Sequence, residues 1–268
     1  MATETNPLVQ RFLGLSEVDV EQIDGAKRLE AHAAVLRRKP MLAEVFRECH
    51  QAFMDLDLRC FGDTPGMRLE LGAGVAPIRS TYSEVLATDV VPGAGLDRVI
   101  DAMDIDVPEG SVRALYGQNC FHHFPEPERF LASAERAVAP GGGVILIEPF
   151  YGPVASVLYK HLFASEDFDK DMAGWTTDAS GPMTGANQAL SYIVFVRDRA
   201  EFERRFPALE LVGSRPLDNY VRYLASGGLN FRQLVPTASA GLLKRLEAAI
   251  ARANRRLALH QIIVLRRR

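Results

Sequence analysis

Residues 68–74 read Arg-Leu-Glu-Leu-Gly-Ala-Gly, an apolar segment that ends in a Gly-x-Gly turn, and Asp89 closes the next apolar run. Glycine has no Cβ and readily adopts positive φ, so such a turn lets a ligand lie directly against the backbone. An acid at the end of the following strand can bind the two hydroxyls of a ribose. The stretch therefore predicts a nucleoside pocket at the carboxyl end of a strand.

Length and charge narrow the class of protein. The chain has 268 residues, enough for one large α/β domain or for one domain with a sizeable insertion. Its formal net charge of −3 provides no basic field for a phosphate backbone, so nucleic acid is not expected as the main partner. We expect a small-molecule substrate, and a homodimer is left open.

Cysteine usage and hydropathy indicate the compartment. Cys49, Cys60 and Cys120 are odd in number and lack the spacing of metal ligands, so we expect free thiols in a reducing environment. Residues 1–11 lack the apolar core of a signal peptide, and no apolar run approaches the roughly 20 residues that cross a bilayer. These features predict a soluble, cytoplasmic protein without a membrane partner.

The apolar periodicity alternates between strand and helix, which favours a parallel, doubly wound sheet. Helical patterns begin at Ala26, Pro40, about Glu126 and Asp198, where a capping box with Glu201 is expected, and a last helix is expected at 239–257. Strands are expected at 67–71, 84–89, 97–100, 112–117, 143–148, 209–214 and 260–265. We predict an N-terminal helical cap segment at 1–65 and a main domain at 66–268, with a substrate-lid insertion at about 149–192.

The segment Glu70-Leu71-Gly72-Ala73-Gly74 resembles the first motif of the class I S-adenosylmethionine-dependent methyltransferases of the small-molecule type. The resemblance covers about residues 67–149 and, in a general way, the last strand–helix–strand. It implies a Rossmann-like, doubly wound, mostly parallel seven-stranded sheet with an antiparallel last strand. The implied cofactor is S-adenosyl-L-methionine.

The same resemblance assigns cofactor contacts around the glycine turn. Glu70 would place the ammonium group of the cofactor, and the backbone of Gly72, Ala73 and Gly74 would run along its methionine and ribose. Asp89, followed by Val90, would bind the ribose hydroxyls. A dinucleotide fold usually has an apolar residue in place of Glu70 and a third glycine where Pro77 stands, so a nicotinamide cofactor is less well supported.

Two further segments are implied in the cofactor pocket. Asp101-Ala102-Met103 resembles the stretch that reads adenine, with Asp104 as the alternative acid. Gln118 and Asn119 would line the wall near the methyl group, because the segment from Asn119 to Phe124 resembles the Asn-x-x-His-His-Phe form of the fourth motif. Arg113 departs from the acid that the family commonly has earlier in this strand.

The candidate catalytic residues are His123, preferred as a general base, and His122. An imidazole can accept a proton near neutral pH, although the family also uses this dipeptide structurally. Paired histidines also suggest a metal, but no Asp or Glu stands nearby at a suitable spacing, so no metal is predicted.

The predicted lid at 149–192 would decide the substrate. The candidate lining residues are Glu148, Tyr151, His161, Trp175 and Asn187. Trp175, the only tryptophan, either stacks on a substrate ring or fills a small satellite core. Gly181 to Asn187 is expected to form a loop that closes over the substrate.

The sequence therefore predicts an enzyme of small-molecule biosynthesis that methylates an oxygen atom, with a sugar or a natural-product scaffold as the expected acceptor. Nitrogen and carbon acceptors stay open. The alternatives are an NAD(P)-dependent oxidoreductase on a similar sheet and a non-catalytic protein that binds S-adenosylmethionine for regulation or assembly.

Overall fold

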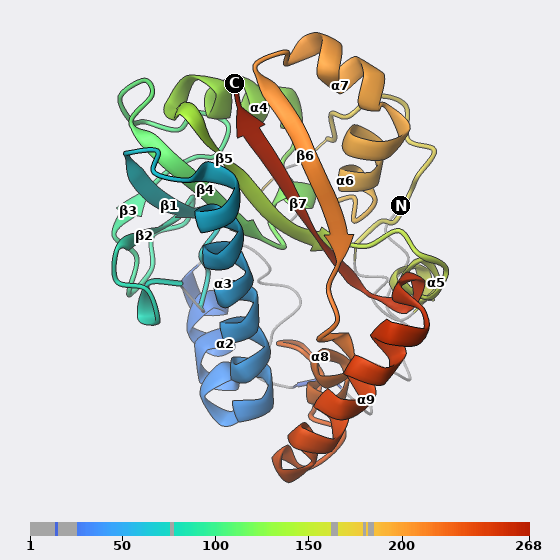
Figure 1. Ribbon diagram of the computed structural model, residues 1–268. Coiled ribbons are helices and arrows are strands. Elements are labelled where there is room, and N and C mark those ends of the chain that lie inside the picture. The colour runs from blue at the N-terminus through green and yellow to red at the C-terminus, as the bar shows by residue number, and fades with distance from the viewer. Residues whose placement is uncertain (1–13, 16–25, 76–77, 162–165, 179–180, 182–184) are drawn as a thin grey trace.

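The fold is organised around one seven-stranded sheet with the strand order β3-β2-β1-β4-β5-β7-β6 (Figure 1). The computed structural model describes residues 14–15, 26–75, 78–161, 166–178, 181 and 185–268. The strands are β1 (Met67–Leu71), β2 (Val85–Asp89), β3 (Arg98–Val99), β4 (Val112–Gln118), β5 (Val138–Pro149), β6 (Leu209–Pro216) and β7 (His260–Arg267).

The pairing confirms the predicted fold class. Strands β1 to β5 pair in parallel, and β7 runs antiparallel to both β5 and β6. In β4, six of seven residues are buried, as expected for a central strand that is covered on both faces. The strand order changes direction between β1 and β4, which is where open α/β sheets bind ligands.

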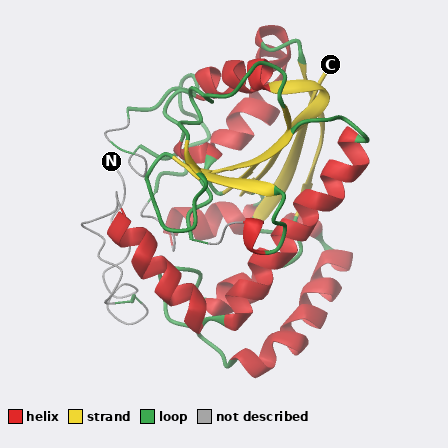
Figure 2. Cartoon of the chain, turned by 90° about the vertical axis from the view of Figure 1, so that its left-hand side faces the viewer, coloured by secondary structure: helices red, strands yellow, loops and turns green. Residues whose placement is uncertain are grey.

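Helices cover both faces of the sheet (Figure 2). Helix α3 (Pro40–Phe61) packs on one face, where Phe53, Phe61 and Tyr116 belong to one apolar cluster. Pro40 occupies its first turn, as predicted. Helix α4 (Pro127–Ala137) covers the other face together with a continuous segment, which consists of α6 (Leu190–Tyr192), the π-helical turn η4 (Ile193–Arg197) and α7 (Arg199–Arg205).

A group of helices lies beyond the carboxyl ends of the parallel strands, the end to which the arrow of β6 points in Figure 1. We call it the helical cap: α2 (Ala26–Arg38), the N-terminal half of α3, α8 (Tyr220–Ser226) and α9 (Ala240–Ala253). Arg222 of α8 is almost fully buried there and binds Glu247 of α9 at 2.7 Å and Glu48 of α3 at 2.5 Å. The cap is therefore joined by charged side chains from three helices.

A second buried ion cluster explains Arg113, the residue that departs from the family pattern. Asp57 of α3 is fully buried and accepts hydrogen bonds from Arg113 Nε at 2.7 Å, Arg68 Nε at 2.7 Å and the Tyr116 hydroxyl at 2.6 Å. Arg113 also donates to the carbonyl of Gly62 at 2.7 Å. Its charge thus fixes the C-terminal half of α3 against β1 and β4.

Several predicted elements differ from the structure. The predicted lid contains a regular helix, α5 (Pro153–His161), and α8 was not predicted. Strand β5 begins at Val138, so the segment 140–143 lies inside the strand instead of ending a helix. Asp198 does not cap α7 with its side chain, because its carboxylate accepts hydrogen bonds from Trp175 Nε1 and Arg197.

The described parts of the connections between β1 and β4 contain little helix. Within the described residues between these strands, the only helical turn is the 3₁₀ turn η2 (Ile78–Ser80). Pro77, which stands in place of a third glycine, lies outside the described residues. The other 3₁₀ turns in the described residues are η3 (Phe121–His123), η5 (Thr237–Ser239) and η6 (Arg255–Leu257). No helix in the described part of the chain is long and apolar enough to cross a membrane.

Candidate functional site

The glycine turn after β1 and the acid after β2 meet as the sequence predicts. Gly72 and Gly74 have φ of +62° and +53°, which a side chain would strain. One oxygen of Asp89 accepts the Gly74 N–H at 3.1 Å, and the other accepts the Val91 N–H at 3.1 Å. Val90 between them is 44% exposed. The Asp89 carboxylate is therefore fixed beside the turn with lone pairs to spare.

Close packing beneath the turn explains why position 72 is a glycine. A Cβ added to Gly72 would stand 2.9 Å from the Cβ of Cys120, closer than two carbon atoms can approach. Ala73 is buried, and its N–H donates to the carbonyl of Thr88 at 2.9 Å. The turn is thereby pressed between the ends of β2 and β4.

Glu70 lies under the same turn, at the end of β1. It is almost fully buried, and its carboxylate accepts the Ile78 N–H at 2.8 Å. Burial raises the pKa of Glu70 to about 8; the hydrogen bond from Ile78 opposes this rise, and the nearby charge of Asp89 adds to it. The hydrogen bond from Ile78 to Glu70 thus closes the loop that follows the glycines. A nearby cation would stabilise the charged form of the buried Glu70 carboxyl.

The segment after β3 forms a compact turn. Asp101 accepts the Met103 N–H at 2.8 Å on its side chain and the Asp104 N–H at 3.0 Å on its carbonyl. Ala102 is buried, whereas both acids are exposed. Both Asp101 and Asp104 can still meet a ligand, so the choice between them stays a prediction.

The end of β4 carries a strained residue. Asn119 has φ of +53°, the one positive value outside glycine among the described residues. Its N–H donates to the carbonyl of Ile147 at 2.8 Å, and its buried Oδ1 has no hydrogen-bond partner within the described part of the chain. Gln118 precedes it and is half-buried. Such a backbone, with a polar atom unsatisfied, is typical of a ligand-contacting position.

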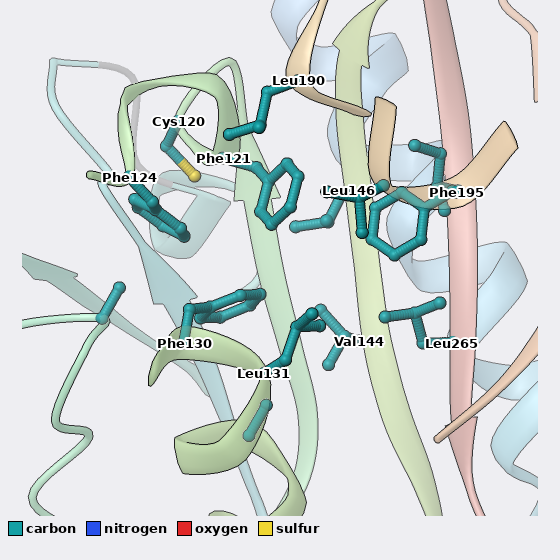
Figure 3. Close-up of a cluster of buried hydrophobic side chains, with 14 of the residues drawn as sticks. Cys120, Phe121, Phe124, Phe130, Leu131, Val144, Leu146, Leu190, Phe195 and Leu265 are labelled. Atoms are coloured by element: carbon teal, nitrogen blue, oxygen red, sulfur yellow. The ribbon is translucent and has the colours of Figure 1, made fainter. Parts of the chain in front are cut away.

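The turn after Asn119 is fixed from both sides. Figure 3 shows Phe121 among the apolar side chains of the core, where its ring centroid lies 5.4 Å from that of Phe195 and 5.8 Å from those of Phe124 and Phe130. On the other side, Glu148 holds the backbone of the turn.

Glu148 was predicted to line the substrate, but the structure gives its carboxylate another position. It is fully buried and accepts the N–H groups of Cys120, Phe121 and His122 at 3.0, 2.8 and 3.3 Å. Its Oε2 also lies 2.6 Å from His122 Nδ1. Both oxygens therefore face the turn, and Glu148 positions the two histidines.

The two histidines lie together, with ring centroids 4.3 Å apart, and Glu166 faces both of them. The Nε2 atom of His122 lies 3.4 Å from Glu166 Oε2, and the Nε2 atom of His123 lies 3.7 Å from Glu166 Oε1. His122 is buried, whereas the His123 side chain is 10% exposed and that of Glu166 is 25% exposed.

His122 is not suited to be a general base. Burial lowers its pKa, but the charge of Glu148 and the hydrogen bonds that the ring donates to Glu148 and Glu166 outweigh burial and raise the pKa to about 10. A raised pKa disfavours His122 as the group that accepts a proton near neutral pH. The base role of His123, the preferred candidate, stays a prediction.

Trp175 belongs to the main apolar core and not to the small satellite core that was the alternative to ring stacking. Only 2% of the residue is exposed, and its indole Nε1 donates to Asp198 at 2.9 Å. The guanidinium of Arg205 lies 4.9 Å from the ring centroid, and the ring of Phe206 stacks at 6.5 Å. With its one donor satisfied and its ring covered by α7, Trp175 fastens the lid segment to the main domain.

Asn187 is likewise an internal brace. Its Oδ1 accepts the N–H groups of Asp169 and Ala189, both at 3.0 Å, and its Nδ2 donates to the Asp169 carbonyl at 2.8 Å. Its own N–H donates to the carbonyl of His122 at 3.0 Å. Asn187 therefore joins two parts of the lid segment to the histidine turn, and its amide is fully used.

The other two predicted lid residues are more accessible. Tyr151 is half-buried, with its ring centroid 4.8 Å from that of Tyr192. His161 is exposed at the C-terminal end of α5. Part of the predicted closing loop, residues 182–184, lies outside the described residues. Tyr151 and His161 stay predictions as substrate contacts.

Sequence reasoning missed Glu166. It is separated from His122 by more than 40 positions, in a segment without clear periodicity. The one sequence signal that could have found Glu166 is its position as an acidic residue in the predicted lid, which was expected to cover the substrate.

Comparison with known proteins gives one match to a protein family. Residues 69–146 match the family model described as a methyltransferase domain. This range runs from β1 to β5 and includes the glycine turn, Asp89 and the histidine turn. A search of curated proteins finds no match.

Solved structures share the general fold at low identity. A geranyl diphosphate C-methyltransferase from Streptomyces coelicolor A3(2) is 12% identical, with 96% of this chain and 91% of that chain covered and a TM-score of 0.44. An S-adenosylmethionine-dependent methyltransferase from Mesorhizobium loti is 15% identical, with 76% and 93% covered and a TM-score of 0.43.

A third solved structure is longer than this chain. It is a phosphoethanolamine N-methyltransferase from Haemonchus contortus in complex with S-adenosyl-L-methionine, 12% identical, with a TM-score of 0.43. The match covers 82% of this chain but only 52% of that chain. Likeness at these identities and TM-scores does not define what this chain acts on.

Proposed function

We propose that the chain is a class I S-adenosylmethionine-dependent methyltransferase that transfers a methyl group to an oxygen atom of a small molecule, which the match of residues 69–146 to a methyltransferase domain supports. The observation that carries this proposal is the hydrogen bond between the Gly74 N–H and the Asp89 carboxylate. That contact fixes the ribose-binding acid of the predicted pocket beside the glycine turn.

The described residues fit the cofactor. A carboxylate offers about four lone-pair positions, and Asp89 uses two for backbone N–H groups, so two ribose hydroxyls can still bind. The buried Oδ1 of Asn119, without a partner among the described residues, offers an acceptor at the strand end. Glu70 would counter the ammonium group, and the exposed Asp101 or Asp104 would bind the adenine amine.

S-adenosylmethionine supplies an electrophilic methyl group on a sulfonium. What the protein contributes to such a transfer is mainly alignment of the acceptor and exclusion of water. The helical cap and the lid segment support this role, because the cap covers the carboxyl edge of the sheet (Figure 1). The proposed transfer therefore rests mainly on alignment, and His123 is the residue proposed to accept a proton from the acceptor.

The charges beside the histidine turn, at the carboxyl edge of the sheet, favour a hydroxyl acceptor over a protonated amine. The carboxylates beside the histidine turn are already engaged, Glu148 by three backbone N–H groups and His122, and Glu166 by contacts to both histidines. Neither is a free anion that would attract an ammonium group. Nitrogen and carbon acceptors are outcomes of the test below.

The first test is ligand-induced stabilisation. A ligand present at 100 times its Kd raises the free energy of unfolding by about 2.7 kcal/mol. We expect S-adenosylhomocysteine to raise the thermal midpoint of the full chain, and NAD or NADP at the same concentration to leave it unchanged. Asp89→Asn should lose most of the shift. Stabilisation by NAD alone would support the oxidoreductase alternative instead.

The second test is transfer itself. A panel of hydroxyl, amine and carbon acceptors would be incubated with radiolabelled S-adenosylmethionine, and the products would be identified by mass spectrometry. A labelled oxygen ether or ester supports the proposal, and a labelled amine or carbon corrects the acceptor atom. Binding of S-adenosylhomocysteine without any product on a broad panel would favour the non-catalytic alternative.

A further inference from the structure

A group of three metal-ligating side chains, those of His122, His123 and Glu166, lies beside the strand ends. The Nε2 atoms of His122 and His123 and the Glu166 carboxylate point toward one another, and one ligand atom from each lies within 4.8 Å of the other two. The sequence argued against a metal because no acid stands near the histidines along the chain. Folding of the lid segment supplies that acid.

The separations suit a bound ion. Zinc binds imidazole nitrogen at about 2.0–2.1 Å and carboxylate oxygen at about 2.0–2.2 Å, so neighbouring ligands of a tetrahedral site stand roughly 3.4 Å apart. The two histidine-to-carboxylate distances are 3.4 and 3.7 Å. One ligand atom from each of the three residues lies within 4.8 Å of the other two, so closing the set around an ion requires the side chains to draw together.

The surroundings of His122 match those of a metal ligand. Its Nδ1 lies 2.6 Å from the fully buried Glu148, an arrangement that directs the other ring nitrogen, Nε2, toward Glu166. A carboxylate behind a ligating histidine is a common outer-shell partner, because it fixes the ring and increases its basicity. Glu148 is itself held by three backbone N–H groups, so the support is rigid.

We propose that His122, His123 and Glu166 form a binding site for one divalent transition-metal ion, with Glu148 as the partner that orients His122. Two imidazoles and one carboxylate favour Zn²⁺, Fe²⁺ or Co²⁺ over Mg²⁺ or Ca²⁺, which prefer oxygen ligands. Three protein ligands leave a coordination position open, as in catalytic zinc sites, and an oxygen atom of water or of a small molecule can fill it.

The charges around the site also favour a cation. The carboxylates of Glu148 and Glu166 both face the two histidines, and a divalent ion would offset their negative charge. The competing explanation is a purely structural unit, a protonated His122 held between Glu148 and Glu166, and the experiment must separate the two.

The test uses the full chain without a polyhistidine tag, stripped with a chelator and then titrated with Zn²⁺ in competition with a chromophoric chelator. We expect one site per chain, and a weakening of at least about tenfold in Glu166→Gln and in His123→Gln. Co²⁺ should give a visible absorption band in the wild type that both variants lose. Glu203→Gln, an exposed acid that pairs with Arg199 on α7, is the matched control and should bind as the wild type does.

Equal affinity for Zn²⁺ in the wild type and in both ligand variants would overturn the site, as would the absence of a tight site in a folded wild type. S-adenosylhomocysteine binding, measured on the same samples, shows that each variant is folded. It also reports on the proposed function separately, since the nucleoside pocket uses Asp89 and not these ligands.

Discussion

Gly72 and Gly74 lie in the same turn but differ in how much space an added Cβ atom would have. Gly72 and Gly74 both have positive φ, but a Cβ on Gly72 would stand 2.9 Å from Cys120, whereas a Cβ on Gly74 would meet only the Gly72 carbonyl, at 3.9 Å. We therefore expect Gly72→Ala to destabilise the fold by about 1–3 kcal/mol more than Gly74→Ala, because only the first adds a clash to the backbone strain. Urea denaturation of the pair checks this. Equal losses would show that Cys120 moves aside.

Glu70 makes stability depend on pH. Its pKa is about 8 in the folded protein, against 4.5 as an ordinary carboxyl, so between these values the folded state binds more protons than the unfolded state. The free energy of unfolding should therefore fall as pH rises from about 4.5 to 8, by at most about 5 kcal/mol. Urea denaturation at several pH values should show a smaller fall in Glu70→Gln. An unchanged slope would contradict the raised pKa.

At the residue scale, the sequence predicted contacts that follow from strand ends and missed those that depend on distant side chains. Asp89 meets Gly74 because parallel strands end at one edge, which periodicity alone can place. The pairing of Asp57 with Arg113 joins residues 56 positions apart and leaves no local pattern. Glu166 belongs to the same class. Charge partners of this kind become visible only when the helices have docked.

At the element scale, charged clusters decide how the helical cap is held. Arg222 and Glu247 are both almost fully buried, and Glu247 accepts hydrogen bonds from the Arg222 N–H and Nε, both at 2.7 Å. Glu247→Gln removes one buried partner of Arg222 while Glu48 still pairs with it, so the substitution should cost about 2 kcal/mol in the free energy of unfolding, as for the loss of a buried charged hydrogen bond. Glu210→Gln breaks an exposed pair with Arg266 and should cost less than about 1 kcal/mol. Similar losses in the two variants, measured by urea denaturation, would contradict this account.

The strands were better predicted than the lid. The bounds of β1 agree with the sequence, because a short apolar run before a glycine turn has few other solutions. Helix α5 was missed, since the glycines, prolines and aromatic residues around it obscure its period. Asp198 was expected to cap α7, but a tertiary donor, the indole of Trp175, binds its carboxylate. Local rules therefore fail where a tertiary contact competes with a local one.

At the scale of the whole molecule, the two halves of the sheet differ in how much helix covers them. The half made of β1 to β3 is joined by loops in which the described residues contain one 3₁₀ turn, and β3 has two exposed residues. The half made of β4 to β7 is covered by α3, α4 and the α6–α7 segment. Amide hydrogen exchange should therefore be faster in β2 and β3 than in β5 and β7. S-adenosylhomocysteine should slow exchange in β2 and at the glycine turn. Uniform exchange across the sheet would contradict the difference.

Helix α3 connects two ionic anchors. Glu48, near the middle of the helix, is bound to Arg222 in the helical cap, and Asp57, about 14 Å further along the axis, is bound to Arg113. Because a helix transmits force along its axis, α3 can act as a lever arm between the ligand edge and the opposite end of the sheet. Opening the cap then requires either a rigid swing of this lever or release of Arg222 from its acids. Because Arg222 and Glu247 are almost fully buried, dissolved salt would screen their pairing only weakly, so cap opening should depend little on ionic strength.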